Sequence, residues 1–234
     1  LFDGYSHLDD IEELGQTLHR ARPYFSQTED QGHFLSYLHR GSFFYRRCSN
    51  YNKAEQLEQQ ALRIANDSGL IRHIAICQNN LGDMAKERKQ FVAAREHFHK
   101  AYRLFSALNN MYAYLALYNL GATLVLEDQI EDAADIFNQV IQKSTPFDFQ
   151  LITIYSYFQL LYIKAKLKDS TGWDDHLRLL QGLLQERHLY NPELEAIIDS
   201  VILQSEEWSE THKSKLNKLL EDWLGKDHQF FHRK

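Results

Sequence analysis

The sequence is poor in residues that break helices, because its 234 residues include only 10 glycines and 3 prolines. All-β folds need many turns and use more of both residues, so this shortage favours long helices. Cysteine is also scarce: Cys48 and Cys77 are too few for a disulfide scaffold, and they do not form a CxxC motif. We expect both thiols to be buried, reduced and structural, which favours a cytoplasmic protein.

Positive charge and long apolar runs are missing as well. The net charge is −6 and no basic stripe is visible, so we expect no nucleic-acid partner through this segment. No apolar run approaches the roughly 20 residues that span a bilayer, and no signal peptide is present, so we expect no membrane contact. The chain begins at Leu1 instead of methionine, which suggests a piece of a longer protein.

Motifs of catalysis are absent too: the sequence contains no GxGxxG, GxxxxGK[ST], HExxH or GxSxG. The acidic pair Asp174-Asp175 falls at an expected helix start, where it complements the helix dipole. His97 and His99 are two residues apart and so lie on different faces of a helix. His33 and His39 are six apart, which is equally unsuited to one ion. We therefore predict no enzyme activity, no cofactor and no metal.

What the sequence does contain is an internal repeat. Asn-Leu-Gly occurs at Leu81-Gly82 and again, 39 residues later, at Leu120-Gly121. In both copies an alanine follows the glycine by twelve residues and a phenylalanine follows that alanine by four; these are Ala94 and Phe98, then Ala133 and Phe137. The glycine lets a second helix approach closely, and the alanine and phenylalanine fill the layer between the helices. An isolated pair of this kind cannot bury its apolar face, so we expect the pairs to stack.

Two less regular copies flank these. Upstream, Gly41-Ser42 replaces Leu-Gly, Ala54 keeps its place, and Glu58 stands where the phenylalanine belongs. Downstream, Leu160-Leu161 replaces Leu-Gly, and Trp173 falls near the alanine place. Degenerate outer copies are expected in stacked repeats, because end repeats face solvent on one side.

This pattern resembles the tetratricopeptide repeat (TPR) family over roughly residues 30–187. The period is longer than the usual 34 residues, as in the branch that includes bacterial signal-responsive regulators, peptide-pheromone receptors and polarity scaffolds. The resemblance implies an all-α fold, a right-handed superhelical solenoid of antiparallel helix pairs. It implies an N-terminal helix in 1–29, with half of a truncated repeat as the alternative, four pairs in 30–187, and capping helices with a frayed tail in 188–234.

Apolar periodicity and end signals place the helices. The expected helices are His7–Tyr24, Gln31–Arg47, Lys53–Asn66, Ile71–Arg88, Phe91–Leu108, Met111–Leu126, Ile130–Lys143, Phe149–Leu167, Trp173–Arg187, Pro192–Trp208 and Glu210–Leu224.

The resemblance also implies a concave groove lined by the first helix of each pair, which would hold a protein or peptide. Carried over by register, its partner-binding residues are His39, Phe43, Arg46, Asn79, Asp83, Lys86, Tyr118, Tyr155, Phe158 and Tyr162. Tyr155 and Tyr162 have an alternative as core residues, and the helices after Asn191 could either cap the stack or fill the groove.

Two functions remain open at this point. The first is a protein- or peptide-binding module, serving as the sensing or scaffolding part of a larger regulatory or signalling protein. The second is a small-ligand or peptide-pheromone sensor domain of a transcription regulator.

Overall fold

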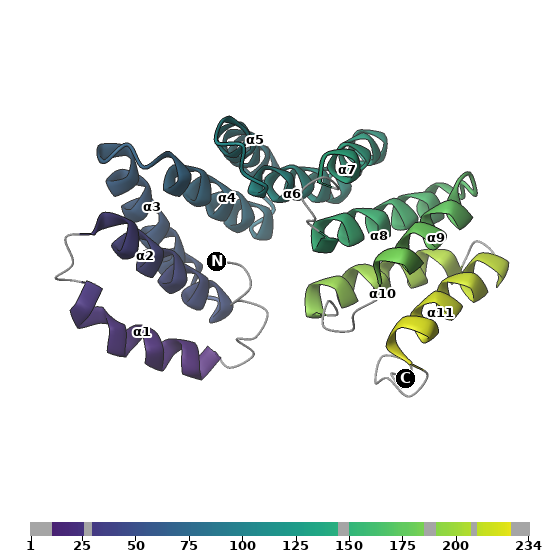
Figure 1. Ribbon diagram of the computed structural model, residues 1–234, viewed down its shortest axis with the longest axis horizontal. Helices are drawn as coiled ribbons and strands as arrows, with labels where there is room; N and C mark the ends of the chain where they lie inside the picture. The colour runs from purple at the N-terminus through teal and green to yellow at the C-terminus, as the bar shows by residue number, and fades with distance from the viewer. Residues whose placement is uncertain (1–10, 26–29, 145–149, 185–190, 207–209, 226–234) are drawn as a thin grey trace. The chain divides into compact units, whose positions relative to one another are not determined.

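The computed structural model describes residues 11–25, 30–144, 150–184, 191–206 and 210–225. These residues form eleven α-helices and, within the described ranges, no strand, which confirms the expected all-α fold (Figure 1). The chain divides into two compact units, Leu1–Thr123 and Leu124–Lys234, and each is described by itself.

Unit 1 contains five complete helices and most of a sixth. They are α1 (Ile11–Phe25), α2 (Gln31–Arg47), α3 (Tyr51–Asp67), α4 (Ile71–Glu87), α5 (Phe91–Ala107) and α6 (Tyr112–Leu126), which continues into unit 2. α2 packs on α3, α3 on α4, and α4 on α5, so successive helices form stacked antiparallel pairs. Helices α2, α4 and α6 begin at Gln31, Ile71 and Tyr112, which matches the expected repeat of about 40 residues.

The sequence placed the ends of these helices well. α2 has the predicted bounds, and the backbone N–H of His33 donates to the side chain of its N-cap Asp30. α3 begins two residues before the predicted start, because the side chain of Asn50 accepts a hydrogen bond from the backbone N–H of Lys53. The part of the predicted first helix before Ile11 lies outside the described residues.

The second pair, α4 with α5, has the packing that the glycine predicts. A Cβ added at Gly82 would lie 2.7 Å from Cε1 of Phe98, so only glycine allows this ring to sit where it does. Phe98 and Ala94 are fully buried. A further layer joins Ala75 of α4, Phe105 of α5 and Ala116 of α6. Close approach of small residues therefore builds the core of unit 1.

Unit 2 is organised around one helix. Its helices are α7 (Ile130–Ser144), α8 (Gln150–Leu167), α9 (Trp173–Leu183), α10 (Pro192–Glu206) and α11 (Glu210–Leu224). α8 packs against α7, α9 and α10, and in Figure 1 it lies between α9 and the end of α7 with α10 beside it. Its residues are accordingly buried on all sides of the helix, as the consecutive residues Ile154, Tyr155, Ser156 and Tyr157 illustrate.

Two sequence predictions are wrong. Cys48 is exposed, because it is the C-cap of α2, where the chain leaves the helix; Cys77 is buried as expected. α9 ends at Leu183, earlier than the predicted Arg187, and residues 185–190 lie outside the described part. The predicted ends near Trp208 and the predicted frayed tail from residue 226 also lie outside it.

Candidate functional site

Charged side chains gather on the first helices of unit 1, at the C-terminal ends of α2 and α4. Arg46 of α2 lies 3.6 Å from a carboxylate oxygen of Asp83 and 3.5 Å from one of Glu87, both on α4. Lys86 lies 3.1 Å from the other carboxylate oxygen of Asp83. The guanidinium group of Arg46 also sits over the ring of Phe43, 5.9 Å from its centroid. We call Phe43, Arg46, Asp83, Lys86 and Glu87 the α2/α4 ion network.

The α2/α4 ion network is only partly covered. The side chains of Arg46, Asp83 and Lys86 retain 24%, 17% and 21% of their exposure, and Glu87 retains 35%. Burial raises the pKa of Glu87, and the neighbouring Asp83 carboxylate adds to this, while Arg46 opposes it. These side chains are buried enough to be held in place by their neighbours, and they are exposed enough for a ligand to contact them.

Four of the predicted groove residues belong to this network: Phe43, Arg46, Asp83 and Lys86. A fifth, Tyr162 of α8 in unit 2, is also partly exposed. The structure buries the other five, which are His39, Asn79, Tyr118, Tyr155 and Phe158. Asn79 accepts a hydrogen bond from the side-chain amide of Asn119 at 3.2 Å.

Tyr155 shows how unit 2 differs from the expected groove. Its hydroxyl donates to the Asn191 side chain at 2.9 Å, next to the first residue of α10. Burial raises the pKa of this phenol, and the negative charge of Glu193 raises it further. The C-terminal helix α10 thus covers the part of α8 that contains Tyr155.

A second group of polar residues is buried where α2, α3 and α4 meet. Nδ1 of His39 lies 3.0 Å from Oε2 of Glu58, and Asn80 donates to Oε1 of the same carboxylate at 2.9 Å. Nε2 of His39 lies 3.3 Å from Nδ1 of His73, with the two rings stacked at 5.5 Å between centroids. Cys77, one turn after His73 on α4, completes what we call the His39 cluster.

The sequence analysis missed the His39 cluster, although two signals pointed to it. His73 and Cys77 are four residues apart, which places them on the same face of a helix. Glu58 occupies a position that is buried in the other repeats. His97 of the pair His97 and His99 lies outside the cluster, with its Nδ1 2.8 Å from Oε1 of Gln78.

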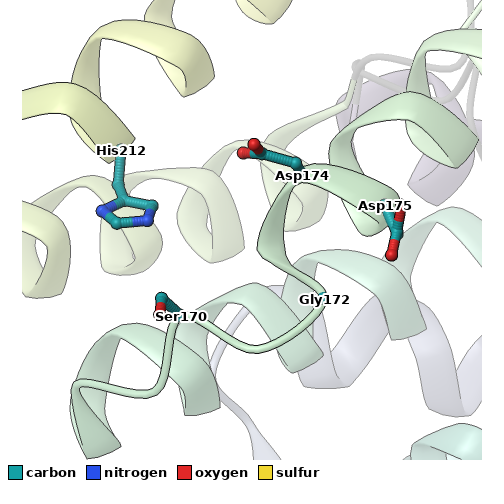
Figure 2. A pocket seen from close by; sticks show the side chains of 5 residues that line it. All are labelled: Ser170, Gly172, Asp174, Asp175 and His212. Atoms are coloured by element: carbon teal, nitrogen blue, oxygen red, sulfur yellow. The ribbon is translucent and has the colours of Figure 1, made fainter.

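Unit 2 contains a surface depression of about 360 Å³, lined by Ser170, Gly172, Asp174, Asp175 and His212. Figure 2 shows the two carboxylates pointing in different directions, with that of Asp174 on the side of His212. Asp174 pairs with Lys215 at 2.5 Å and Asp175 with Arg178 at 3.2 Å. Both carboxylates are more than half exposed and neutralised locally, so the depression has no convergent set of catalytic groups.

Across the described helices, none combines the length and apolarity needed to cross a membrane.

Comparison with known proteins defines the fold. No family model matches the chain, and no curated protein matches it by sequence. Among solved structures, the chain is similar to BtubC (BKLC) from P. vanneervenii, with a TM-score of 0.61 and 16% identity over 79% of this chain and 77% of that one. It is also similar to a putative kinesin light chain from Podosopora anserina with nearly identical TPR-like repeats, with a TM-score of 0.60 and 12% identity over 84% and 98% of the two chains. The chain therefore has a TPR-like helical-repeat fold.

Proposed function

We propose that this chain is a protein-binding module that uses the first-helix face of unit 1 to hold a segment of a partner. The α2/α4 ion network is the observation that supports this proposal. TPR-like stacks bind ligands along the row of first helices, and the network lies on two consecutive helices of that row. The proposal includes a place in the longer-repeat TPR branch and a cytoplasmic scaffolding or sensing role in a larger regulatory protein.

The charges of the network suggest the chemistry of the partner. Two cations, Arg46 and Lys86, alternate with two anions, Asp83 and Glu87, and Phe43 offers an apolar surface beside them. A peptide of one charge would meet repulsion from half of this set. The network therefore favours a segment with an acidic side chain that pairs with Arg46 and a basic side chain that pairs with Asp83. An apolar residue of the same segment would pack on Phe43.

Partner capture with matched variants tests this proposal. Proteins retained from host lysate by the chain are identified, and the affinity of one purified partner is then measured for a double variant, Arg46→Ala with Lys86→Ala. Removing two central charged contacts should weaken binding by about tenfold to a hundredfold. The control is Arg63→Ala with Lys100→Ala, which removes two exposed cations from the second helices α3 and α5.

Equal loss in the two double variants would mean that overall charge, and not the first-helix face, attracts the partner. Full affinity in the Arg46 and Lys86 variant would show that binding lies elsewhere on the chain.

A further inference from the structure

The His39 cluster places three different metal-binding atoms next to one another inside unit 1. Nδ1 or Nε2 of His39, a carboxylate oxygen of Glu58 and Sγ of Cys77 all lie within 4.8 Å of one another. They come from α2, α3 and α4, so the packing of three helices fixes their positions. All three residues are buried, with relative exposures of 7% for His39 and 0% for Glu58 and Cys77.

The chemistry of these donors fits zinc. Imidazole nitrogen, carboxylate oxygen and thiolate sulfur are the three ligand types of protein zinc sites. A carboxylate and a thiolate carry two negative charges together, which balance one divalent cation in a place where an unbalanced charge is costly. We propose that His39, Glu58 and Cys77 bind a single Zn²⁺ ion, with a water molecule in the fourth coordination position.

Neighbouring side chains are placed to orient two of these ligands. Asn80 donates to Oε1 of Glu58, and His73 lies against Nε2 of His39 while Nδ1 of His39 faces Glu58. When Nδ1 binds the ion, the proton on Nε2 is donated to His73. Such outer partners fix the tautomer and the ring orientation of a ligating histidine.

His73 also marks the side from which the ion can enter. It is only half buried, and it is close enough to the exposed Asp30 carboxylate at the start of α2 to feel its charge. Gly32 places no side chain over it, whereas a Cβ there would be in van der Waals contact, 3.8 Å from Nε2 of His73.

Without a metal, the cysteine remains a thiol. Burial raises the pKa of Cys77 strongly, and the Glu58 carboxylate raises it further. Ion binding then exchanges the thiol proton, which leaves to solvent, for a metal–sulfur bond.

Cobalt spectroscopy on one variant tests the proposal. The chain has only two cysteines, so Cys48→Ser leaves Cys77 as the sole thiol without touching the cluster. After chelator treatment, Co²⁺ is titrated into this variant. We expect thiolate-to-cobalt charge-transfer absorption in the near ultraviolet that saturates at one equivalent and is displaced by Zn²⁺. Absence of that absorption overturns the proposal, whatever the behaviour of other variants.

Two substitutions then test a second ligand, Glu58, and the outer partner of the third ligand, His39. Glu58→Gln preserves shape but removes the ligand charge, and it should weaken Co²⁺ binding by more than tenfold. His73→Gln should weaken it by about tenfold to a hundredfold, as outer-partner changes do. Glu96→Gln makes the same change as Glu58→Gln at an exposed position of α5 and should leave the affinity unchanged.

Binding to exposed histidines is distinguished by the same data. Such ions give no thiolate absorption and remain in the Glu58→Gln variant. If Glu58→Gln and Glu96→Gln bind Co²⁺ equally, the carboxylate is not a ligand and the proposed site is wrong. If Zn²⁺ fails to raise the thermal unfolding temperature of the Cys48→Ser variant, binding is not coupled to the native fold and the proposal also fails.

Discussion

The first and second repeats of unit 1 are both built as a pair of helices, but the layer between the helices is polar in the first and apolar in the second. In the second, Gly82 receives the ring of Phe98 and the layer is apolar. In the first, Ser42 replaces the glycine and its hydroxyl donates to the backbone carbonyl of Ala54 at 3.1 Å. Glu58 replaces the phenylalanine and bonds His39 and Asn80.

The difference teaches that the repeat requires a filled layer and does not require that the layer be apolar. A carboxylate is tolerated at the aromatic position because both of its oxygens have partners, without which its burial would be costly. The same substitution creates a polar site between helices without changing the fold. The following predictions test this comparison, each by urea unfolding in the presence of a chelator, so that bound metal contributes nothing.

The largest effect should come from the apolar layer. Phe98→Ala removes a fully buried ring and leaves Gly82 facing a cavity, which should lower the free energy of unfolding by about 3–5 kcal/mol. Val92→Ala, at an exposed position of the same helix, is the control. A loss below about 1 kcal/mol would show that the second repeat collapses to fill the space.

The polar layer should be almost as sensitive. His39→Leu removes the partner of one oxygen of the buried Glu58 carboxylate and should cost about 3 kcal/mol, since that oxygen stays buried without a hydrogen bond. His33→Leu, which alters an exposed histidine on the same helix, should cost little. Equal effects of the two substitutions would mean that the His39–Glu58 contact does not stabilise unit 1.

Gly82 of the second repeat and Gly41 of the first, which stands at the leucine place of the motif, should respond differently to substitution. A Cβ at Gly82 meets Phe98 at 2.7 Å, so Gly82→Ala should destabilise by about 1–3 kcal/mol. A Cβ at Gly41 meets only the end of the flexible Leu57 side chain at 3.1 Å, and alanine favours the helix by about 1 kcal/mol over glycine. Gly41→Ala should therefore be neutral or stabilising. Destabilisation of the same size in both variants would contradict the close approach argued for Gly82.

Loss of the Ser42 hydroxyl should have a smaller effect. Ser42→Ala removes one hydrogen bond to Ala54 and should cost about 1 kcal/mol or less, because alanine partly offsets the loss by its helix propensity. Ser36→Ala is the control, since that hydroxyl bonds the backbone of its own helix at Gly32. A cost of several kcal/mol would show that Ser42 supports the polar layer in a further way.

The smallest effect is a pH dependence of stability in the second repeat, where His97 faces the neutral side chain of Gln78. Burial lowers the pKa of His97 and nearby Lys100 lowers it further, so the folded state disfavours the charged ring. The contribution of His97 to the free energy of unfolding has its full value above the unfolded pKa of 6.5. This contribution is lost as the pH falls through that value toward the lower pKa of the folded state. His97→Gln should therefore reduce the loss of stability on acidification. The exposed His19→Gln should not, and an unchanged acid profile in His97→Gln would exclude the proposed cause.

Much of the fold could be predicted from local signals. α2 has the bounds that its end signals predict, the spacing from Gly82 to Phe98 identifies one helix pair, and Trp173 is buried at the alanine place of the last repeat, as its register suggests. These features depend on residues close together in the chain, which fix helix ends and faces.

The candidate site was harder to predict. Register placed Arg46 and Asp83 on the correct helices, but it also assigned buried His39 to an open groove. A periodic pattern shows which residues share a helix face and does not show what lies opposite. Glu58 looked like a departure from the repeat because its partners, His39 and Asn80, are 19 and 22 residues away.

The sequence by itself determined that this protein is a stack of helix pairs, because helix periodicity, caps and the close contact of glycine with phenylalanine are set by short-range chemistry. Tertiary structure alone decided which polar residues meet: His39, Glu58 and Cys77 converge only because three helices pack together. It also decided that α10 covers Tyr155, since the burial of a helix face depends on the element packed against it and not on the order of its own residues.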